Sequence, residues 1–212
     1  MLSLAGIRAV AAADAAFSAK TSGRWRVFPI LIDLSTVTAV LIGEGEVAAR
    51  RLAALDEAGA SCLDVYSQAP SAAFLKVAGK RFKGARPADG ALRAAQIVFL
   101  AGLGDRESVA LAGKARAAGR LVNTEDVKPL CDFHVPAIVR RGDLTFSVST
   151  GGKSPGLARR LRRHLESAFG PEWAGRLDEL GRQRKVWRSE GLEPAEIGRR
   201  VDVYIEEKGW LS

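Results

Sequence analysis

Two glycines and an alanine at a fixed spacing are the first residues whose types suit a chemical role. The run Gly43-Glu-Gly45-Glu-Val-Ala48 has the G-x-G-x-x-A spacing of loops that bind the pyrophosphate of a dinucleotide. In such a loop Gly43 permits the tight turn, and Gly45 lets the backbone approach the phosphates. Ala48 lets the following helix pack closely on the preceding strand. A glycine turn that merely connects two elements is the alternative, and the spacing alone does not exclude it.

A second polar group, Asn123-Thr-Glu-Asp126, directly follows a short apolar run. Carboxylates at the carboxyl end of a parallel strand can act as general acids or bases, or can bind a metal ion. The same residues could equally cap a turn before Val127-Lys-Pro129, and residue types alone leave both interpretations open. His134 could act together with Asp126, although a histidine beside Phe133 is more often a packed one.

A third group combines glycines, hydroxyl groups and positive charge. The loop Ser149-Thr-Gly-Gly-Lys-Ser154 precedes Pro155, which suits the first turn of a helix, and a loop at a helix N-terminus can bind an anion. In the predicted helix, apolar residues recur at spacings of three and four and form one face: Ala158, Leu161, Leu165 and Ala168. The rest of its surface is basic and comprises Arg159, Arg160, Arg162, Arg163 and His164. For most of these arginines the alternative is an ordinary solvated helix face.

The surrounding pattern predicts the elements that position these groups. Strands are expected at 37–42, 61–66, 97–101 and from 121, and helices at 47–58 and 108–118. This alternation predicts a doubly wound α/β fold with a parallel sheet, whereas the segment 74–82 has no clear pattern. From Pro136 the pattern changes. Strands are expected at 137–139 and 144–148 and mostly helix at 155–210, so a domain boundary is expected near residue 135.

Composition narrows the class of protein. The chain has 212 residues, of which 47% are hydrophobic, and a net charge of +8 that favours an anionic partner without naming it. Cys62 and Cys131 belong to no CxxC or Cys/His cluster, which argues against structural zinc and favours reduced thiols in a cytoplasmic protein. No apolar run reaches the roughly 18 residues of a membrane-spanning helix. The alanine-rich start, 1–19, lacks the clean apolar block of a signal peptide.

Taken together, these stretches resemble the precorrin-2 dehydrogenase/sirohydrochlorin ferrochelatase family of sirohaem biosynthesis. The resemblance is to the N-terminal module of sirohaem synthase, without the methyltransferase domain that some relatives carry. It covers the chain from about residue 27 to the C-terminal helices. The stretches that carry it are Phe28-Pro-Ile30, LIGEGEVAARR, EAGA, VNTED and CDFHVPAIVRRGDLTFSVSTGGKSPGLARRLRRHLE. The run from Phe133 to Glu166 is the most specific part, because two unrelated nucleotide-binding folds would not share it.

The resemblance implies a homodimer with a Rossmann-like parallel sheet, then a small α+β dimerisation region and a C-terminal helical domain. The expected divisions are an N-terminal extension at 1–26, an NAD-binding Rossmann domain at 27–135, a dimerisation region at 136–170 and a helical domain at 171–212. The implied reaction is the NAD-dependent oxidation of precorrin-2 to sirohydrochlorin. Ferrous iron is then inserted in members that retain chelatase activity. Precorrin-2 carries many carboxylates, which would explain the basic surface.

Residue roles follow from the resemblance by position. Asp126 is expected to be the general base and to take part in metal insertion. NAD is expected to contact Gly43, Gly45, Glu46, Val47, Ser67, Ala101 and Gly102. The tetrapyrrole is expected to contact Asn123, Thr150, Gly151, Gly152, Lys153 and Arg159. Neither a resident metal ion, nor nucleic acid, nor a membrane is expected as a partner.

Three positions depart from the expected pattern of the cofactor site. The second strand should end in Asp or Glu to bind the ribose, but the chain has Tyr66-Ser67-Gln68, of which Ser67 could hydrogen-bond a ribose. No arginine follows directly to favour a 2′-phosphate, so NAD is preferred over NADP only weakly. Glu44 replaces the middle glycine of the family's Gly-Gly-Gly loop, which requires its side chain to point outward. Gly102-Leu103-Gly104 replaces a segment that usually contains threonine and aspartate.

Two other classes of function are consistent with parts of the sequence. A protein that binds a tetrapyrrole or nucleotide without turnover would account for the altered segment at 102–104. A nucleic-acid-binding protein would account for the basic helix and predicts affinity that falls steeply with salt. The chain has no recognisable nucleic-acid motif, and Trp173, Trp187 and Trp210 are scattered through predicted helices.

Overall fold

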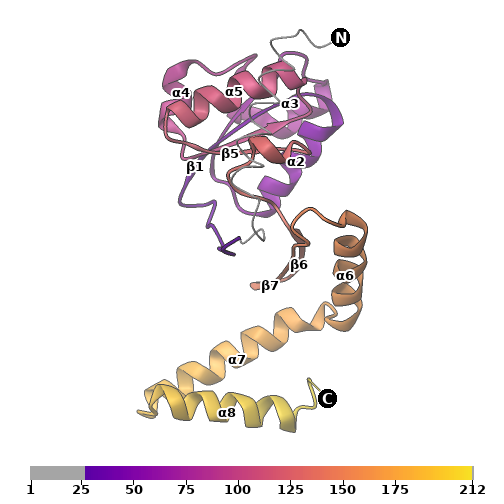
Figure 1. Cartoon of the computed structure of the whole chain (residues 1–212). Helices are drawn as coiled ribbons and strands as arrows, with labels where there is room; N and C mark the ends of the chain where they lie inside the picture. The colour runs from indigo at the N-terminus through magenta and orange to yellow at the C-terminus, as the bar shows by residue number, and fades with distance from the viewer. Residues whose placement is uncertain (1–26, 212) are drawn as a thin grey trace. The chain divides into compact units, whose positions relative to one another are not determined.

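The computed structural model describes residues 27–211, so the predicted N-terminal extension lies outside the described residues. The chain divides into two compact units, Met1–His134 and Val135–Ser212 (Figure 1). Each unit is described by itself. Within 27–211, no helix is both long enough and apolar enough to cross a membrane.

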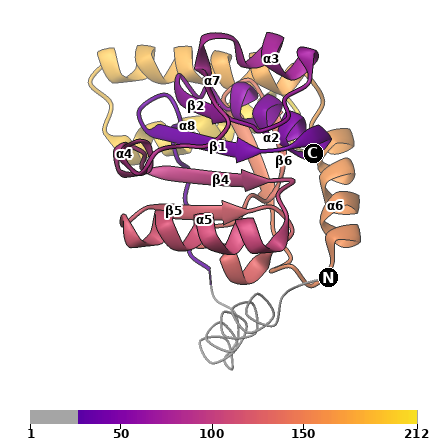
Figure 2. The ribbon, with the colours of Figure 1, turned by 90° about the horizontal axis from the view of Figure 1, so that it is seen from above.

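The first unit is built on a parallel sheet. Its strands are β1 (Thr38–Gly43), β2 (Cys62–Tyr66), β3 (Phe82–Gly84), β4 (Ile97–Ala101) and β5 (Leu121–Thr124), in the order β3-β2-β1-β4-β5. Figure 2 shows β1, β4 and β5 running side by side in one direction. The chain winds outward from β1 to β3 and then returns to β4. The carboxyl ends of β1 and β4 therefore form the topological switch point, where ligands bind on such sheets.

Helices cover both faces of this sheet, as alternate residues of β1 require. Ala39 and Leu41 pack in the cluster with α2 (Gly45–Glu57) and α3 (Ala72–Ala78), whereas Val40 and Ile42 pack in the cluster with α4 (Asp89–Ala94) and α5 (Asp105–Ala117). All four of these β1 residues are at most 1% exposed. Because β1 is buried on both faces, it reads as a continuous apolar run in the sequence. The structure confirms the predicted α/β fold.

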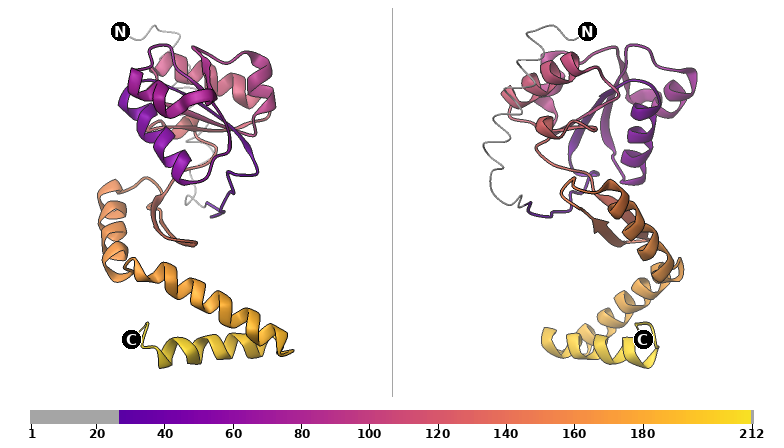
Figure 3. Two further views of the ribbon diagram at one scale, coloured as in Figure 1. Left: turned by 180° about the vertical axis from the view of Figure 1, so that it is seen from behind. Right: turned by 45° about the vertical axis from the view of Figure 1, so that its right-hand side comes forward.

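The second unit begins with an antiparallel hairpin of β6 (Ala137–Arg141) and β7 (Leu144–Val148). The helices α6 (Pro155–Ala168), α7 (Glu172–Ser189) and α8 (Pro194–Glu207) follow, and α7 and α8 lie against each other (Figure 3). Arg141 ties the hairpin to the end of α6. Its Nε donates to the Phe169 carbonyl at 2.7 Å and its Nη2 to the Glu166 carbonyl at 3.0 Å. These bonds satisfy carbonyls that have no partner within the helix.

Aromatic side chains join the helices of the second unit. Phe169 contacts both Phe146 and Trp173, and Trp187 contacts Tyr204 of α8 at 6.2 Å between ring centroids. Trp173 also lies 6.4 Å from Trp210. The three tryptophans that the sequence scatters over predicted helices therefore take part in ring contacts inside this unit.

Candidate functional site

The glycine turn lies where β1 meets α2, and Gly43 is packed tightly against β4. A Cβ atom at Gly43 would stand 2.4 Å from the Ala101 carbonyl oxygen and 2.8 Å from the Cβ of Ala48. Neither approach is sterically allowed, so position 43 needs glycine. The helix and the two strands can pack this closely because Gly43 has no side chain and Ala48 has a small one.

Gly45 borders open space at the start of α2. Its φ is 61°, and a Cβ added to it would meet no atom within 4 Å. α2 begins at Gly45, so the backbone N–H groups of its first turn, including those of Glu46 and Val47, have no acceptor within the helix. No side chain caps this end of α2. The residues present therefore fit the pyrophosphate of a dinucleotide, which such N–H groups and the helix dipole would bind.

The end of β4 completes the turn. The Glu44 N–H donates to the Ala101 carbonyl at 3.0 Å. Gly102 has a φ of 69°, and a Cβ on it would lie 2.3 Å from the Glu44 carbonyl oxygen and 3.1 Å from the Cβ of Val47. Gly102 thus permits the close approach of the β4 end to the glycine turn, a role that the sequence did not reveal.

Asp126 lies in the loop after β5, which is anchored to both β4 and α2. The Glu125 N–H donates to the Leu100 carbonyl at 2.9 Å, and the Glu125 carboxylate pairs with Arg51 of α2 at 2.9 Å. The glycine turn and the Asp126 loop are therefore bound to consecutive carbonyls of one strand. Asp126 itself is exposed, so its carboxylate is accessible to a ligand.

The backbone of Asp126 is strained. Its φ is 60°, and it is the only non-glycine residue within 27–211 with a positive φ. Side chains of L-residues disfavour this left-handed region, although aspartate tolerates it better than most. Strain of this kind persists where surrounding contacts impose it, and it is concentrated at functional sites.

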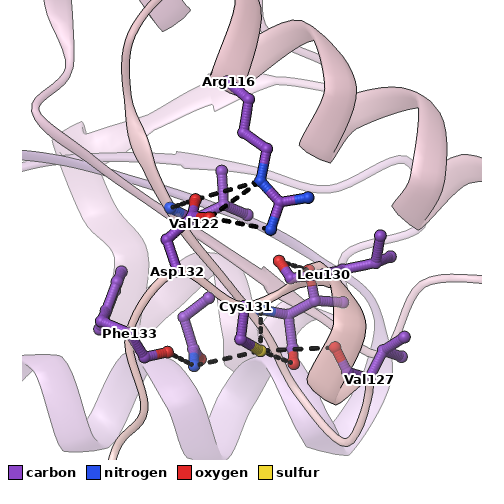
Figure 4. A network of polar contacts seen from close by, with 9 residues as sticks. Arg116, Val122, Val127, Leu130, Cys131, Asp132 and Phe133 are labelled. Carbon is purple, nitrogen blue, oxygen red and sulfur yellow. Dashed lines mark hydrogen bonds and ion pairs between the residues drawn. The ribbon is translucent and has the colours of Figure 1, made fainter. Parts of the chain in front are cut away.

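Contacts from Cys131 and Asp132 hold the strand before Asp126 and the residue after it (Figure 4). Cys131 Sγ accepts from the Thr124 N–H at 3.3 Å and lies 3.4 Å from the Val127 carbonyl. Asp132 accepts from the Val122 N–H at 3.0 Å and pairs with Arg116 of α5 at 2.9 Å. Burial raises the pKa of the Cys131 thiol, which therefore acts here as a packed hydrogen-bonding group.

Asn123, a predicted substrate contact, is 5% exposed. Its Nδ2 donates to the Phe133 carbonyl at 3.0 Å, and the Phe133 ring packs edge-on against Phe99 at 5.5 Å. The structure thus gives Asn123 a role in closing the segment after β5. His134 follows directly, and burial and the nearby Lys128 lower its pKa. Within 27–211, no three His, Cys, Asp or Glu side chains gather closely enough to hold a metal ion.

Ser67, the predicted ribose contact, is 3% exposed and lies at the carboxyl end of β2. Its hydroxyl donates to the Glu44 carboxylate at 2.7 Å, and Arg86 binds the same carboxylate at 2.9 Å. Sequence reasoning missed Arg86, because it looked for an arginine directly after β2. Arg86 follows β3, which is the strand paired with β2.

The remaining predicted residues belong to the second unit and are described within that unit. The Thr150 hydroxyl donates to the Ser154 carbonyl at 3.1 Å, and Gly151 and Gly152 have φ values of 63° and 76°. Ser154 caps α6 by accepting from the Leu157 N–H at 3.2 Å. Lys153 and Arg159 are exposed.

Comparisons with known proteins agree with this architecture. Residues 30–137 match a family model described as putative NAD(P)-binding, and residues 141–168 match one described as sirohaem biosynthesis protein central. The siroheme synthase of Methylococcus capsulatus is 35% identical over 164 residues, which cover 72% of this chain and 32% of that protein. Siroheme synthase 1 of Cronobacter sakazakii is 35% identical over 155 residues, with the same coverage of 72% and 32%.

Among solved structures, the precorrin-2 dehydrogenase SirC has a similar fold, with a TM-score of 0.67 at 19% identity. The match covers 88% of this chain and 93% of that one. The chain spans about a third of the length of the curated synthases that it matches. The first family model covers half of the chain, and the second covers the hairpin turn, β7 and α6. The chain therefore belongs to the family formed by the NAD(P)-binding N-terminal module of siroheme synthases.

Proposed function

We propose that this protein is an NAD-dependent dehydrogenase that oxidises precorrin-2 to sirohydrochlorin. One structural observation carries the proposal. The loop that presents Asp126 is bound to β4 through the Leu100 carbonyl and to α2 through the Arg51–Glu125 pair, and the glycine turn is bound to β4 through the next carbonyl, that of Ala101. An exposed carboxylate is thereby held at the same sheet edge as a turn suited to a dinucleotide. Family membership supplies the substrate.

The residues of the first unit divide the work. The N–H groups of the first turn of α2 bind the pyrophosphate, and Gly45 leaves the space that it needs. NAD⁺, when bound, supplies the hydride acceptor. Asp126 takes the proton that the macrocycle releases as it loses a hydride, so that one hydride and one proton leave the substrate together. The strained backbone fixes the direction in which this carboxylate points.

The second unit contributes positive charge for a polycarboxylate substrate. We propose that Lys153 and Arg159 bind carboxylates of the tetrapyrrole, because both are exposed and positively charged. Lys153 follows the two glycines of the loop, and Arg159 lies in the first half of α6. Gly151, Gly152 and Thr150 shape this loop through their left-handed conformations and the Thr150–Ser154 bonds.

We further propose a homodimer formed through the second unit. Within α6 no residue is buried, and the apolar side chains Leu157 and Leu161 are 49% and 39% exposed. An amphipathic helix normally buries such a face, and a second copy of this chain would cover it. The two cysteines of the chain are unpaired, which is compatible with the reducing conditions of the cytoplasm.

An anaerobic assay with precorrin-2 and NAD⁺ tests the proposed function. We expect NADH to form with the wild-type protein and to fall at least ~100-fold with Asp126→Asn, since general-base catalysis is worth about 10²–10⁴ in rate. Asparagine tolerates the left-handed conformation, so this variant should keep the backbone conformation of residue 126. Asp202→Asn, at an exposed position of α8, is the matched control.

Undiminished turnover by Asp126→Asn would remove Asp126 from the reaction. Tight binding of the tetrapyrrole without any NADH would favour the alternative, a binding protein. Adding Fe²⁺ to the oxidised product, while following the absorbance of the macrocycle, tests whether ferrous iron is a second substrate.

A further inference from the structure

The side chain of Glu44 leaves the glycine turn and ends at the carboxyl end of β2. One carboxylate oxygen, Oε2, accepts from the Ser67 hydroxyl at 2.7 Å and the Ala69 N–H at 3.1 Å. The other, Oε1, accepts from the Gln68 N–H at 2.7 Å and Arg86 Nη1 at 2.9 Å. Glu44 thus connects the first two strands of the sheet through a dense set of hydrogen bonds.

This location is the one where dinucleotide-binding folds place an acidic residue. In those folds an Asp or Glu at the end of the second strand accepts hydrogen bonds from the ribose hydroxyls. In this chain β2 ends at Tyr66, and Ser67 follows it, so the strand supplies no carboxylate. Glu44 supplies one from the neighbouring turn. The Glu44 carboxylate in the glycine loop therefore takes the place of the acid that β2 lacks.

The groups around the Glu44 carboxylate are all donors. We refer to Ser67, Gln68, Ala69 and Arg86 as the β2 donor cluster. A hydroxyl, two backbone N–H groups and a guanidinium would equally suit a phosphate, and an arginine near this strand end accommodates the 2′-phosphate of NADP in related folds. The carboxylate of Glu44 already occupies these donors.

Arg86 is fixed in place. Its Nε binds Glu107 of α5, and its side chain is 19% exposed. Its Nη2 is buried without a hydrogen-bond partner among residues 27–211, so the guanidinium has a donor to spare. Burial raises the pKa of Glu44, but hydrogen bonds from Gln68, Ser67, Arg86 and Ala69 outweigh it and lower that pKa to about 2. Glu44 is therefore ionised at neutral pH.

We propose that Glu44 makes this protein select NAD over NADP, by holding a carboxylate where the 2′-phosphate of NADP would bind. The inference rests on the proposed function in so far as it takes the glycine turn to be the dinucleotide site. A ribose 2′-hydroxyl is uncharged, so the Glu44 carboxylate does not repel it. A 2′-phosphate would be repelled by its charge and would find the β2 donor cluster occupied.

Titrations of the intact protein with NADH and NADPH test this inference by measuring dissociation constants directly. Glu44→Ser is the first variant, because Glu44 is the N-cap residue of α2 and serine is favoured there. We expect the wild type to bind NADH more tightly than NADPH. In Glu44→Ser we expect the NADPH dissociation constant to fall about tenfold or more, because the β2 donor cluster becomes free. Glu44→Gly, which also removes the carboxylate, should change the NADPH dissociation constant in the same direction.

Two further variants serve as controls for this test. Adding Arg86→Gln to Glu44→Ser should reverse the gain in NADPH affinity, because the guanidinium is the charged member of the β2 donor cluster. Glu57→Gln is the matched control, since Glu57 is an exposed acid at the opposite end of α2. It should leave both dissociation constants unchanged. Circular dichroism verifies that each variant is folded.

The outcomes separate this inference from the proposed function. If Glu44→Ser binds both nucleotides with the wild-type ratio of dissociation constants, Glu44 does not select the cofactor, and the dehydrogenase proposal stands. If neither the wild type nor the folded variants bind either nucleotide, the glycine turn is not a dinucleotide site, and both proposals are wrong.

Discussion

Asp126 combines an exposed carboxylate with a backbone that most residues avoid. A left-handed conformation costs a residue other than glycine roughly 1–2 kcal/mol, and aspartate somewhat less. The contacts of Cys131 and Asp132 with the strand before it hold the loop in this shape. Glycine adopts a positive φ with less strain than aspartate, so we infer that the carboxylate is there for its chemistry.

Substitution of Asp126 should therefore separate stability from activity. We expect Asp126→Gly to leave the free energy of unfolding unchanged or to raise it by up to about 1 kcal/mol, because glycine adopts a positive φ without strain. Asp126→Val should lower it by about 1–2 kcal/mol, because a β-branched residue is least suited to this region. Urea unfolding followed by circular dichroism measures both. A clear loss of stability with glycine would show that the carboxylate supports the fold.

At the residue scale, local spacing predicted some of the candidate site. The glycine turn and the polar group Asn123-Thr-Glu-Asp126 are candidates from the sequence because each follows an apolar strand, whereas the role of Asp126 comes from the family resemblance and stays a prediction. The Glu44–Arg86 pair could not, because it depends on β3 lying beside β2, and 42 positions separate the two residues. The burial of Asn123 likewise depends on its contact with Phe133, which the sequence pattern does not encode.

At the element scale, Glu44 connects the β1–α2 turn to the end of β2 through an ionised carboxylate. Its pKa in the folded protein, about 2, lies below the ordinary value of 4.5. A depressed pKa means that the carboxylate contributes its full stabilisation above about pH 4.5. That contribution is lost as the pH falls from 4.5 through 2.

Comparing the wild type with Glu44→Gln tests this linkage. At pH 7 we expect the wild type to have the larger free energy of unfolding, by about 1 kcal/mol, the upper end for partly exposed ion pairs. The difference should shrink when the measurement is repeated at pH 3. A difference that is the same at both pH values would mean that the charge of Glu44 does not connect these elements.

Most elements of the first unit could be predicted, because buried strands and amphipathic helices have strong sequence patterns. Expected strands at 37–42, 61–66 and 97–101 correspond to β1, β2 and β4. The segment 74–82 has no clear sequence pattern, and it contains most of α3 and the start of β3. These elements have seven and three residues. Elements this short are determined by packing against β2 rather than by their own periodicity.

On the scale of the whole molecule, the two units hold different parts of the predicted chemistry. The first unit contains the glycine turn, the β2 donor cluster and Asp126, and the second contains the basic loop and α6. Sequence patterns indicated a change in architecture near residue 135, because alternating strands and helices give way to a hairpin and charged helices. A pattern within one chain cannot encode how copies of it associate, so the homodimer is a proposal.

The apolar face of α6 should control the assembly of the molecule. We expect Leu161→Gln to weaken the dimer by about tenfold or more, because it places an amide on the apolar face and removes a well-exposed apolar side chain. Arg163→Gln, at an exposed basic position of the same helix, is the matched control. Sedimentation velocity over a range of concentrations measures the effect. Equal behaviour of the two variants would place the interface elsewhere.

The main-chain oxygens of Leu100 and Ala101 are neighbouring acceptors, of which the first binds the Asp126 loop and the second binds the glycine turn. Mutation can replace any side chain, but it leaves peptide carbonyls in place. The distance between the two loops therefore does not depend on which side chains surround them. The side chains of Glu44 and Glu125 can therefore change without removing these two backbone bonds, whereas Gly102 is needed for the close approach of β4 to the glycine turn.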